Sequence, residues 1–165
     1  MIKAYLALGS NLGDRLATLR EARRRLSETD EIRLAASAGL YETRPVGGPP
    51  GQPAYLNTVL EIDTSLAVED LLRLAQQIEA SCGRVRHERW GARTLDIDIL
   101  FYDELVWRAP GLEVPHPRLH QRRFVLLPLA ELAPLLVHPR ENRTVSELLQ
   151  SLPDEGGEAL LAQTW

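Results

Sequence analysis

The stretch TLDIDILFY, residues 94–102, alternates apolar and polar side chains with the two-residue period of a β-strand. Leu95, Ile97 and Ile99 share one face, and Asp96 and Asp98 share the other. The two carboxylates therefore leave the strand on the same side, about 6–7 Å apart along the backbone. This strand completes a series whose order decides the fold, and it carries a pair of acidic groups that could hold Mg²⁺.

The segments before and after this strand have the periodicities of further strands and helices. Strands are predicted for residues 2–8, 33–43 and 55–64, and helices for residues 14–27, 69–82, 121–132 and 144–152. The order strand, helix, strand, strand, helix, strand predicts an α+β fold with a ferredoxin-like antiparallel sheet and helices packed on one face. The C-terminal elements would extend or cover this sheet. A doubly wound parallel sheet is the weaker alternative.

The composition predicts one domain, residues 1–165, with enough apolar residues to form its own core. The net charge of −4 argues against a general binder of nucleic acid or of anionic membranes. Cys82 is the single cysteine, which excludes an internal disulfide and favours a reducing compartment. The longest apolar stretch, residues 125–137, is too short and too interrupted to span a bilayer. We therefore expect a cytoplasmic protein.

Positive charge is concentrated in one segment directly before the acidic strand. Residues 84–93 contain four arginines and one acidic residue, a local net charge of +3 in an acidic chain. Guanidinium groups bind phosphate oxygens in pairs, so the segment suits a polyphosphate. Taken alone, Asp96 and Asp98 would be read as a solvated strand face. Next to four arginines and Trp90, they favour a site for Mg²⁺ and phosphate.

Other residues indicate a planar ligand and argue against some kinds of catalytic site. Tyr55, Asn57, Trp90 and Phe124 combine stacking faces with an amide, which suggests a heterocyclic ligand. The Pro/Gly-rich residues 44–53 form either a linker or a functional loop. A phosphate-binding loop with a glycine-lysine motif is excluded, because Lys3 is the only lysine. The glycines of residues 9–13 are read as a structural turn. Neither Ser10 nor Cys82 has the setting of a nucleophile.

Several motifs together resemble the 6-hydroxymethyl-7,8-dihydropterin pyrophosphokinases of folate biosynthesis. The resemblance runs from the first strand to about Pro134 and rests on Gly9-Ser10-Asn11-Leu12-Gly13, Tyr41-Glu42-Thr43 with Pro45, Gln52-Pro53-x-Tyr55-Leu56-Asn57, Gly83-Arg84-x-Arg86, Arg89-Trp90-Gly91-x-Arg93-Thr94-Leu95-Asp96-x-Asp98-Ile99-Leu100 and Val114-Pro115-His116-Pro117-Arg118. It implies a ferredoxin-like scaffold that binds ATP beside the reduced pterin. It also implies transfer of the pyrophosphoryl group intact, with AMP as the second product.

The resemblance also implies a role for individual residues. Asp96 and Asp98 would hold two Mg²⁺ ions and, with Arg84 and Arg93, form the catalytic set. The implied ATP-binding residues are Glu79, Arg84, Arg86, Arg93, Ile99, His116 and Arg122. The implied pterin-binding residues are Thr43, Val46, Tyr55, Asn57, Trp90 and Phe124. For Glu79 a surface salt bridge is the alternative. The substrates would be ATP and 6-hydroxymethyl-7,8-dihydropterin, bound by a monomer without nucleic acid or membrane, and 165 residues would be the stand-alone form.

The chain departs from the family pattern in its loops. Ala92 and Arg44 stand where relatives often have proline, the segment between Arg86 and Arg89 is one residue short, and Pro117 replaces an aromatic residue of some relatives.

Two other functions are weighed against the pyrophosphokinase. A ferredoxin-like RNA-binding module would need a basic, aromatic sheet face, whereas the best strand presents carboxylates. Another metal-dependent nucleotidyl or glycosyl transferase could also use the acidic pair.

Overall fold

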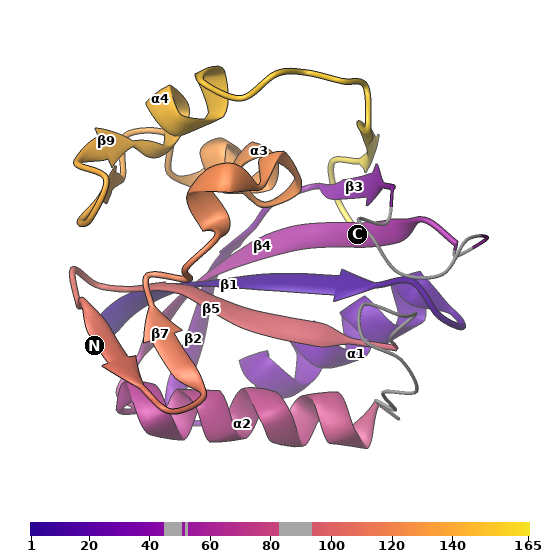
Figure 1. Cartoon of the computed structure of the whole chain (residues 1–165). Coiled ribbons are helices and arrows are strands. Elements are labelled where there is room, and N and C mark those ends of the chain that lie inside the picture. The colour runs from indigo at the N-terminus through magenta and orange to yellow at the C-terminus, as the bar shows by residue number, and fades with distance from the viewer. Residues whose placement is uncertain (45–50, 52, 83–93) are drawn as a thin grey trace.

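The computed structural model, which describes residues 1–44, 51, 53–82 and 94–165, is built around one antiparallel sheet (Figure 1). The sheet runs in the order β10-β3-β4-β1-β5, and β2 also pairs with β4. Its strands are β1 (Ile2–Ser10), β2 (Ile32–Ser37), β3 (Leu40–Thr43), β4 (Tyr55–Thr64), β5 (Asp96–Tyr102) and β10 (Glu158–Ala162). Every pairing is antiparallel, so the predicted α+β fold is confirmed and the parallel alternative is wrong.

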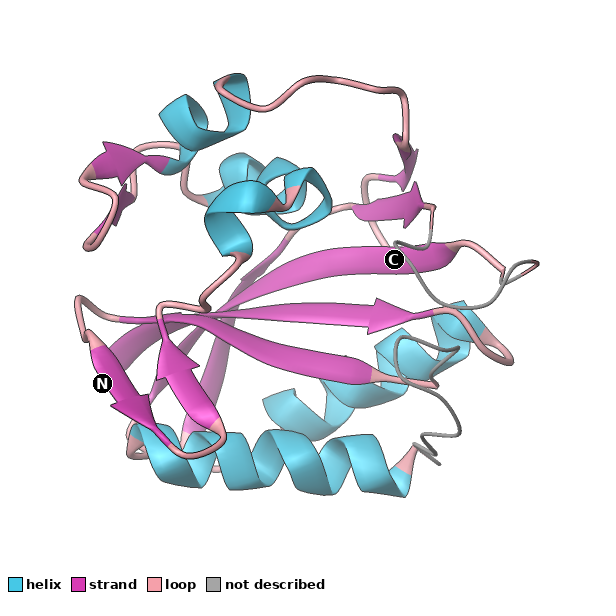
Figure 2. Cartoon of the chain, in the orientation of Figure 1, coloured by secondary structure: helices cyan, strands magenta, loops and turns pink. Residues whose placement is uncertain are grey.

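Helices cover both faces of this sheet (Figures 1 and 2). On one face lie α1 (Arg15–Ser27) and α2 (Val68–Ser81), and on the other lie α3 (Arg123–Leu132) and α4 (Val145–Gln150). The helix α1 begins where predicted, because the Asp14 side chain accepts a hydrogen bond from the Ala17 backbone N–H at 3.0 Å. The C-terminal elements thus cover the second face, as expected.

Each face of the sheet has its own buried core, because alternate side chains of β1 point to opposite faces. Towards α1 and α2 the buried side chains include Leu6, Leu8, Leu19, Leu26, Leu60, Leu71 and Ile78. Towards α3 and α4 they include Tyr5, Val59, Phe101, Leu126, Leu129 and Leu148. The helices predicted for residues 14–27 and 69–82 are therefore confirmed, and each packs buried apolar side chains against the sheet.

The single strand predicted for residues 33–43 is wrong, since the chain forms β2 and β3 with a break between them. At the break the Ala38 backbone N–H donates to the Val59 carbonyl at 2.9 Å, and the Ala38 carbonyl accepts from the Thr58 hydroxyl at 3.1 Å. Gly39 follows in a place where an added Cβ would lie 2.7 Å from the Ala162 carbonyl oxygen. The close approach of a distant segment interrupts the strand, and alternation alone does not reveal it.

The C-terminal third consists of short elements. A hairpin of β6 (Trp107–Ala109) and β7 (Leu112–Val114) leads to a 3₁₀-helix η1 (Leu119–Gln121), and β8 (Val137–His138) pairs with β9 (Arg143–Thr144). The helix predicted from residue 121 begins at Arg123 instead, because Arg122 has extended backbone angles and separates η1 from α3. Within the described ranges, no helix combines the length and apolar character needed to cross a membrane.

Candidate active site

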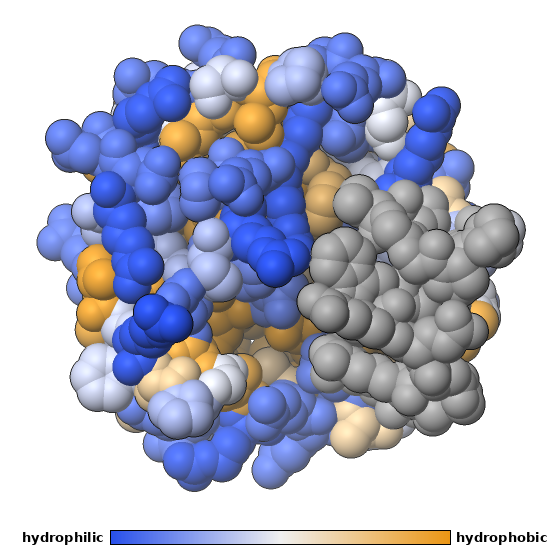
Figure 3. All heavy atoms as spheres, viewed as in Figure 1, coloured by the Kyte–Doolittle hydropathy of each residue, from blue (hydrophilic) through white to orange (hydrophobic). Residues whose placement is uncertain are grey.

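A cavity of about 780 Å³ opens on the sheet face that α3 covers in part. In Figure 3, hydrophilic side chains dominate this side of the molecule, and apolar atoms show in a hollow between them. Among the described residues, eight of those predicted for the site line the cavity: Thr43, Tyr55, Asn57, Asp96, Asp98, His116, Arg122 and Phe124. They come from β3, β4, β5, α3 and the loop after β7, so the fold gathers residues that are more than 70 positions apart in the sequence.

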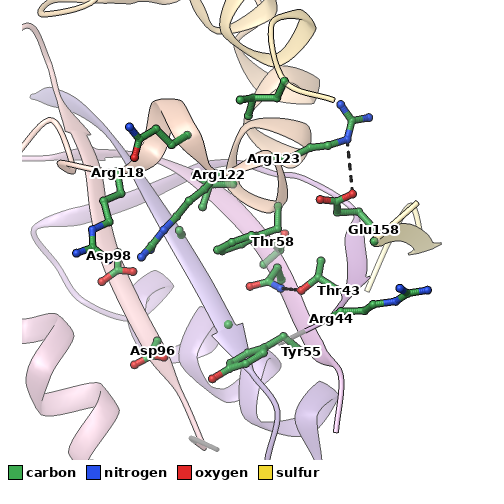
Figure 4. Close-up of a pocket in the computed structure, with 18 of the residues that line it drawn as sticks. Thr43, Arg44, Tyr55, Thr58, Asp96, Asp98, Arg118, Arg122, Arg123 and Glu158 are labelled. Atoms are coloured by element: carbon green, nitrogen blue, oxygen red, sulfur yellow. Dashed lines mark hydrogen bonds and ion pairs between the residues drawn. The ribbon is translucent and has the colours of Figure 1, made fainter. Parts of the chain in front are cut away.

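Asp96 and Asp98 lie on the same side of β5 and face the cavity (Figure 4). Their partners on the neighbouring strand β1 are Gly9, which has no side chain, and Ala7, which has only a methyl group, so both leave space above the sheet. Mg²⁺ is commonly held by one or two carboxylates that share it with substrate phosphates and water. The donor set therefore fits Mg²⁺ bound together with a polyphosphate. Among the described residues, no group of three or more His, Cys, Asp or Glu side chains forms a separate metal site.

Glu79 supports the strand that carries these carboxylates. It projects from α2, its side chain is buried, and its Oε2 accepts a hydrogen bond from the Ile97 backbone N–H at 2.8 Å. Ile97 lies between the two aspartates, so Glu79 holds β5 from the opposite face of the sheet. The side chain is only 5% exposed, so Glu79 does not occupy the surface position that the alternative of a surface salt bridge assumed.

His116 and Arg122 form a polar wall beside the carboxylates. The His116 Nδ1 accepts a hydrogen bond from the Arg118 backbone N–H at 3.2 Å, so a neutral imidazole carries its proton on Nε2. Burial lowers the pKa of His116, and Arg122 and Arg118 lower it further against the opposing effect of Asp98. The ring is therefore a neutral hydrogen-bond donor at neutral pH. Burial also lowers the pKa of Arg122, and Asp98 opposes this shift.

The other end of the cavity combines aromatic faces with a fixed amide. The Asn57 Nδ2 donates a hydrogen bond to the Thr43 hydroxyl, which orients the amide. Gly9 leaves room beside it, since a Cβ there would lie 2.9 Å from the Asn57 Oδ1 and 3.6 Å from the Tyr55 ring. Phe124 enters from the start of α3. A planar heterocycle with polar edges suits this end.

Comparison with known proteins agrees with this geometry. Residues 5–134 match the model of the 7,8-dihydro-6-hydroxymethylpterin-pyrophosphokinase (HPPK) family. The chain belongs to this family. It is 46% identical over 158 residues to the 2-amino-4-hydroxy-6-hydroxymethyldihydropteridine pyrophosphokinase of Pseudomonas aeruginosa, covering 96% of each chain. It is 41% identical over 154 residues to the Haemophilus influenzae enzyme of the same name, covering 93% of this chain and 95% of that one.

Solved structures show the same fold. A crystal structure of an HPPK-DHPS in complex with substrates aligns with a TM-score of 0.77 at 12% identity. The alignment covers 96% of this chain and 46% of that one, so this chain spans about half of that protein. The predicted activity, an HPPK pyrophosphokinase of folate biosynthesis, is confirmed by the family, and the RNA-binding and other-transferase alternatives are wrong.

Not every residue predicted for this HPPK-family site lies in the first cavity. Ile99 is buried and lines a second cavity of about 540 Å³, together with Leu72, Ile97 and Leu112. Glu79 lies below β5 and lines neither cavity. The predictions for Val46, Arg84, Arg86, Trp90 and Arg93 fall outside the described residues.

The structure also adds residues that the sequence did not place in the site. Arg118, Gln121 and Arg123 line the first cavity, as do Leu152, Pro153, Glu155, Gly157 and Glu158. Arg118 has a local signal, because it lies two residues after His116 in the family motif. The C-terminal residues have no such signal in the sequence, because they reach the cavity only through the pairing of β10 with β3.

Proposed function

We propose that the two cavities bind ATP and 6-hydroxymethyl-7,8-dihydropterin side by side for direct transfer of the pyrophosphoryl group, and that the protein acts as a monomer. The hydroxymethyl oxygen of the pterin gives up its proton, for which the neighbouring Asp98 carboxylate or water is the acceptor, and forms a bond to the β-phosphorus of ATP. The bond between this phosphorus and the oxygen bridging to the α-phosphorus breaks, and AMP leaves. The observation that carries this arrangement is that, within the described part of the chain, the two cavities share three lining residues, Asp98, His116 and Arg118.

The second cavity suits the nucleotide base. Leu72, Ile97, Ile99 and Leu112 give it apolar walls, and the ion pair of Arg108 with Glu113, 3.5 Å apart, lies at its side. A base bound there would direct its phosphates towards the shared border. At this border His116 offers a neutral Nε2–H donor and Arg118 offers a cation. Arg122 extends the positive wall into the first cavity.

The first cavity suits the pterin. Its ring would lie between Tyr55 and Phe124, and its polar edge would meet the Asn57 amide, which Thr43 orients. Val46 and Trp90, predicted from the family resemblance, would complete this pocket. The hydroxymethyl group would then point along the sheet towards Asp96 and Asp98 (Figure 4).

Phosphoryl transfer depends on alignment and charge neutralisation more than on covalent catalysis. Arg122 and Arg118 neutralise the phosphates, with Arg84, Arg86 and Arg93 proposed in the same role from the sequence. Enzymes of this family generally depend on Mg²⁺. We propose that Asp96 and Asp98 hold two Mg²⁺ ions, whose chemistry when bound is to neutralise the phosphates and to hold them in line with the pterin hydroxyl.

Asparagine variants of the two carboxylates test this proposal. AMP formation is measured with ATP, the pterin and increasing Mg²⁺ for Asp96→Asn, Asp98→Asn and the control Asp103→Asn. Asp103 follows β5 and lines neither cavity, and its positive φ of 51° is one that asparagine tolerates. We expect Asp98→Asn to lower kcat by about 10²–10³, the usual loss when one group that stabilises developing charge is removed. The proposal is wrong if Asp98→Asn and Asp103→Asn form AMP at the same rate.

A further inference from the structure

The C-terminal segment forms one wall of the pterin end of the first cavity. Leu152, Pro153, Glu155, Gly157 and Glu158 all line it. These residues follow position 134, where the match to the family model ends. The segment therefore contributes to the cavity from outside the range that the family model matches, and Figure 4 shows the Glu158 side chain directed at Arg123.

The segment is first fixed to the strand that carries Thr43. Glu158 begins β10 and is the direct cross-strand partner of Thr43 on β3. One residue earlier, the Gly157 carbonyl accepts a hydrogen bond from the Arg44 backbone N–H at 3.3 Å. Thr43 in turn accepts the hydrogen bond that orients Asn57. The position of Glu158 is thus tied to the polar side of the proposed pterin pocket.

The same residue is also tied to the aromatic side. The Glu158 Oε2 lies 3.5 Å from the Arg123 Nε, and Arg123 is the first residue of α3, between Arg122 and Phe124. The two side chains are 13% and 20% exposed, so water and salt screen this ion pair less than a surface pair. Arg123 also lies 3.4 Å from Asp154, but that carboxylate is 68% exposed and contributes less.

We propose that Glu158 is a positioning residue for the pterin, which sets the spacing between Thr43 on β3 and Phe124 on α3. This inference rests on the proposed function, because it assigns Thr43 and Phe124 to opposite sides of the bound pterin. Backbone pairing fixes Glu158 to β3, and its ion pair with Arg123 then holds the first turn of α3 at a constant distance from that strand. The C-terminal segment thereby completes a pocket whose other described lining residues all lie within the first 125 positions.

The other end of α3 provides a matched control. There Glu131 accepts hydrogen bonds from the Gly39 backbone N–H at 3.2 Å and from the Tyr41 hydroxyl. Glu131 therefore also ties α3 to β3 and the residue before it, but it lines neither cavity. Glu131→Gln and Glu158→Gln make the same chemical change at the two ends of one helix.

Steady-state kinetics and thermal unfolding of both variants test the proposal. We expect Glu158→Gln to raise the KM for the pterin about three- to tenfold, the range that corresponds to a partly buried ion pair. We expect Glu131→Gln to lower the midpoint of thermal unfolding at least as much as Glu158→Gln does. The KM of Glu131→Gln for the pterin should nevertheless equal that of the wild type. Arg123→Gln serves as a second variant should Glu158→Gln fold poorly. The double variant Arg123→Gln/Glu158→Gln should show no higher KM for the pterin than either single variant, because both substitutions remove the same ion pair.

Three outcomes overturn the inference: a wild-type pterin KM in Glu158→Gln, an equal rise in Glu131→Gln, or additive effects in the double variant. AMP formation by the wild-type protein separates failure of this inference from failure of the proposed function. If the wild type forms no AMP from ATP and the pterin, the function itself is wrong. If it forms AMP while Glu158→Gln behaves like the wild type, only the role of Glu158 is refuted.

Discussion

Replacing Glu79 by alanine tests how the strand of the carboxylates is held in place. The Glu79 carboxylate is 5% exposed and accepts the Ile97 N–H at 2.8 Å. Alanine would leave this buried N–H without its acceptor, which costs about 1–3 kcal/mol, and the cavity left by the side chain adds to this. We therefore expect the free energy of unfolding to fall by about 2–3 kcal/mol, which is roughly 4–12 °C in Tm for a chain of this size.

Calorimetry and steady-state kinetics on three variants decide whether this reasoning holds. Glu79→Gln retains an acceptor oxygen and should lose much less stability than Glu79→Ala. Gln77→Ala, at an exposed position of the same helix, should melt like the wild type. Because β5 carries both aspartates, Glu79→Ala should also lower kcat. An unchanged Tm in Glu79→Ala would refute the supporting role. A higher KM for ATP in Glu79→Gln at unchanged stability would indicate that Glu79 contacts the nucleotide directly, as the family resemblance implies.

Three further predictions concern Arg118 at the border of the two cavities, Gly9 beside Asn57, and the buried His138. Arg118→Gln should raise the KM for ATP about fivefold, because it removes a cation from the shared border, and an unchanged KM would contradict the proposed path of the phosphates. Gly9→Ala should raise the KM for the pterin with little change in that for ATP, since the new Cβ would displace the Asn57 amide 2.9 Å away, and structures of the variant would show the shift. Burial lowers the pKa of His138 below its ordinary value of 6.5, so the unfolded chain binds more protons and stability falls as the pH drops through 6.5. His138→Asn should therefore show a shallower decline in the free energy of unfolding between neutral and mildly acidic pH than the wild type, and an equal slope would exclude His138 as the cause.

Local patterns predicted the parts of the fold that depend on local physics. The alternation around Asp96 and Asp98 placed both carboxylates on one strand face, and the structure shows both lining the cavity. The segment 55–64 was predicted with the bounds that β4 has. These successes follow from the two-residue period of a strand with one buried face, which the residues themselves encode.

Long-range contacts limited the prediction elsewhere. The strand β10 has an exposed pattern with Leu160 and Leu161 facing solvent, so nothing in its sequence marks it as a strand paired with β3. The break before Leu40 depends on Ala162, more than 120 residues later. Glu158 reaches Arg123 for the same reason, because the ion pair exists only after β10 has docked. Such features arise from the tertiary fold and have no periodic signature.

The most direct measurement of the central claim follows the phosphates of ATP. ATP labelled separately at the β- and the γ-phosphate is incubated with Mg²⁺, 6-hydroxymethyl-7,8-dihydropterin and the protein, and the products are separated. We predict that both labels appear on the pterin in equal amounts, that unlabelled AMP accumulates at the same rate, and that Asp98→Asn slows both by about 10²–10³. Transfer of the γ-label alone, with ADP as the second product, would contradict the account.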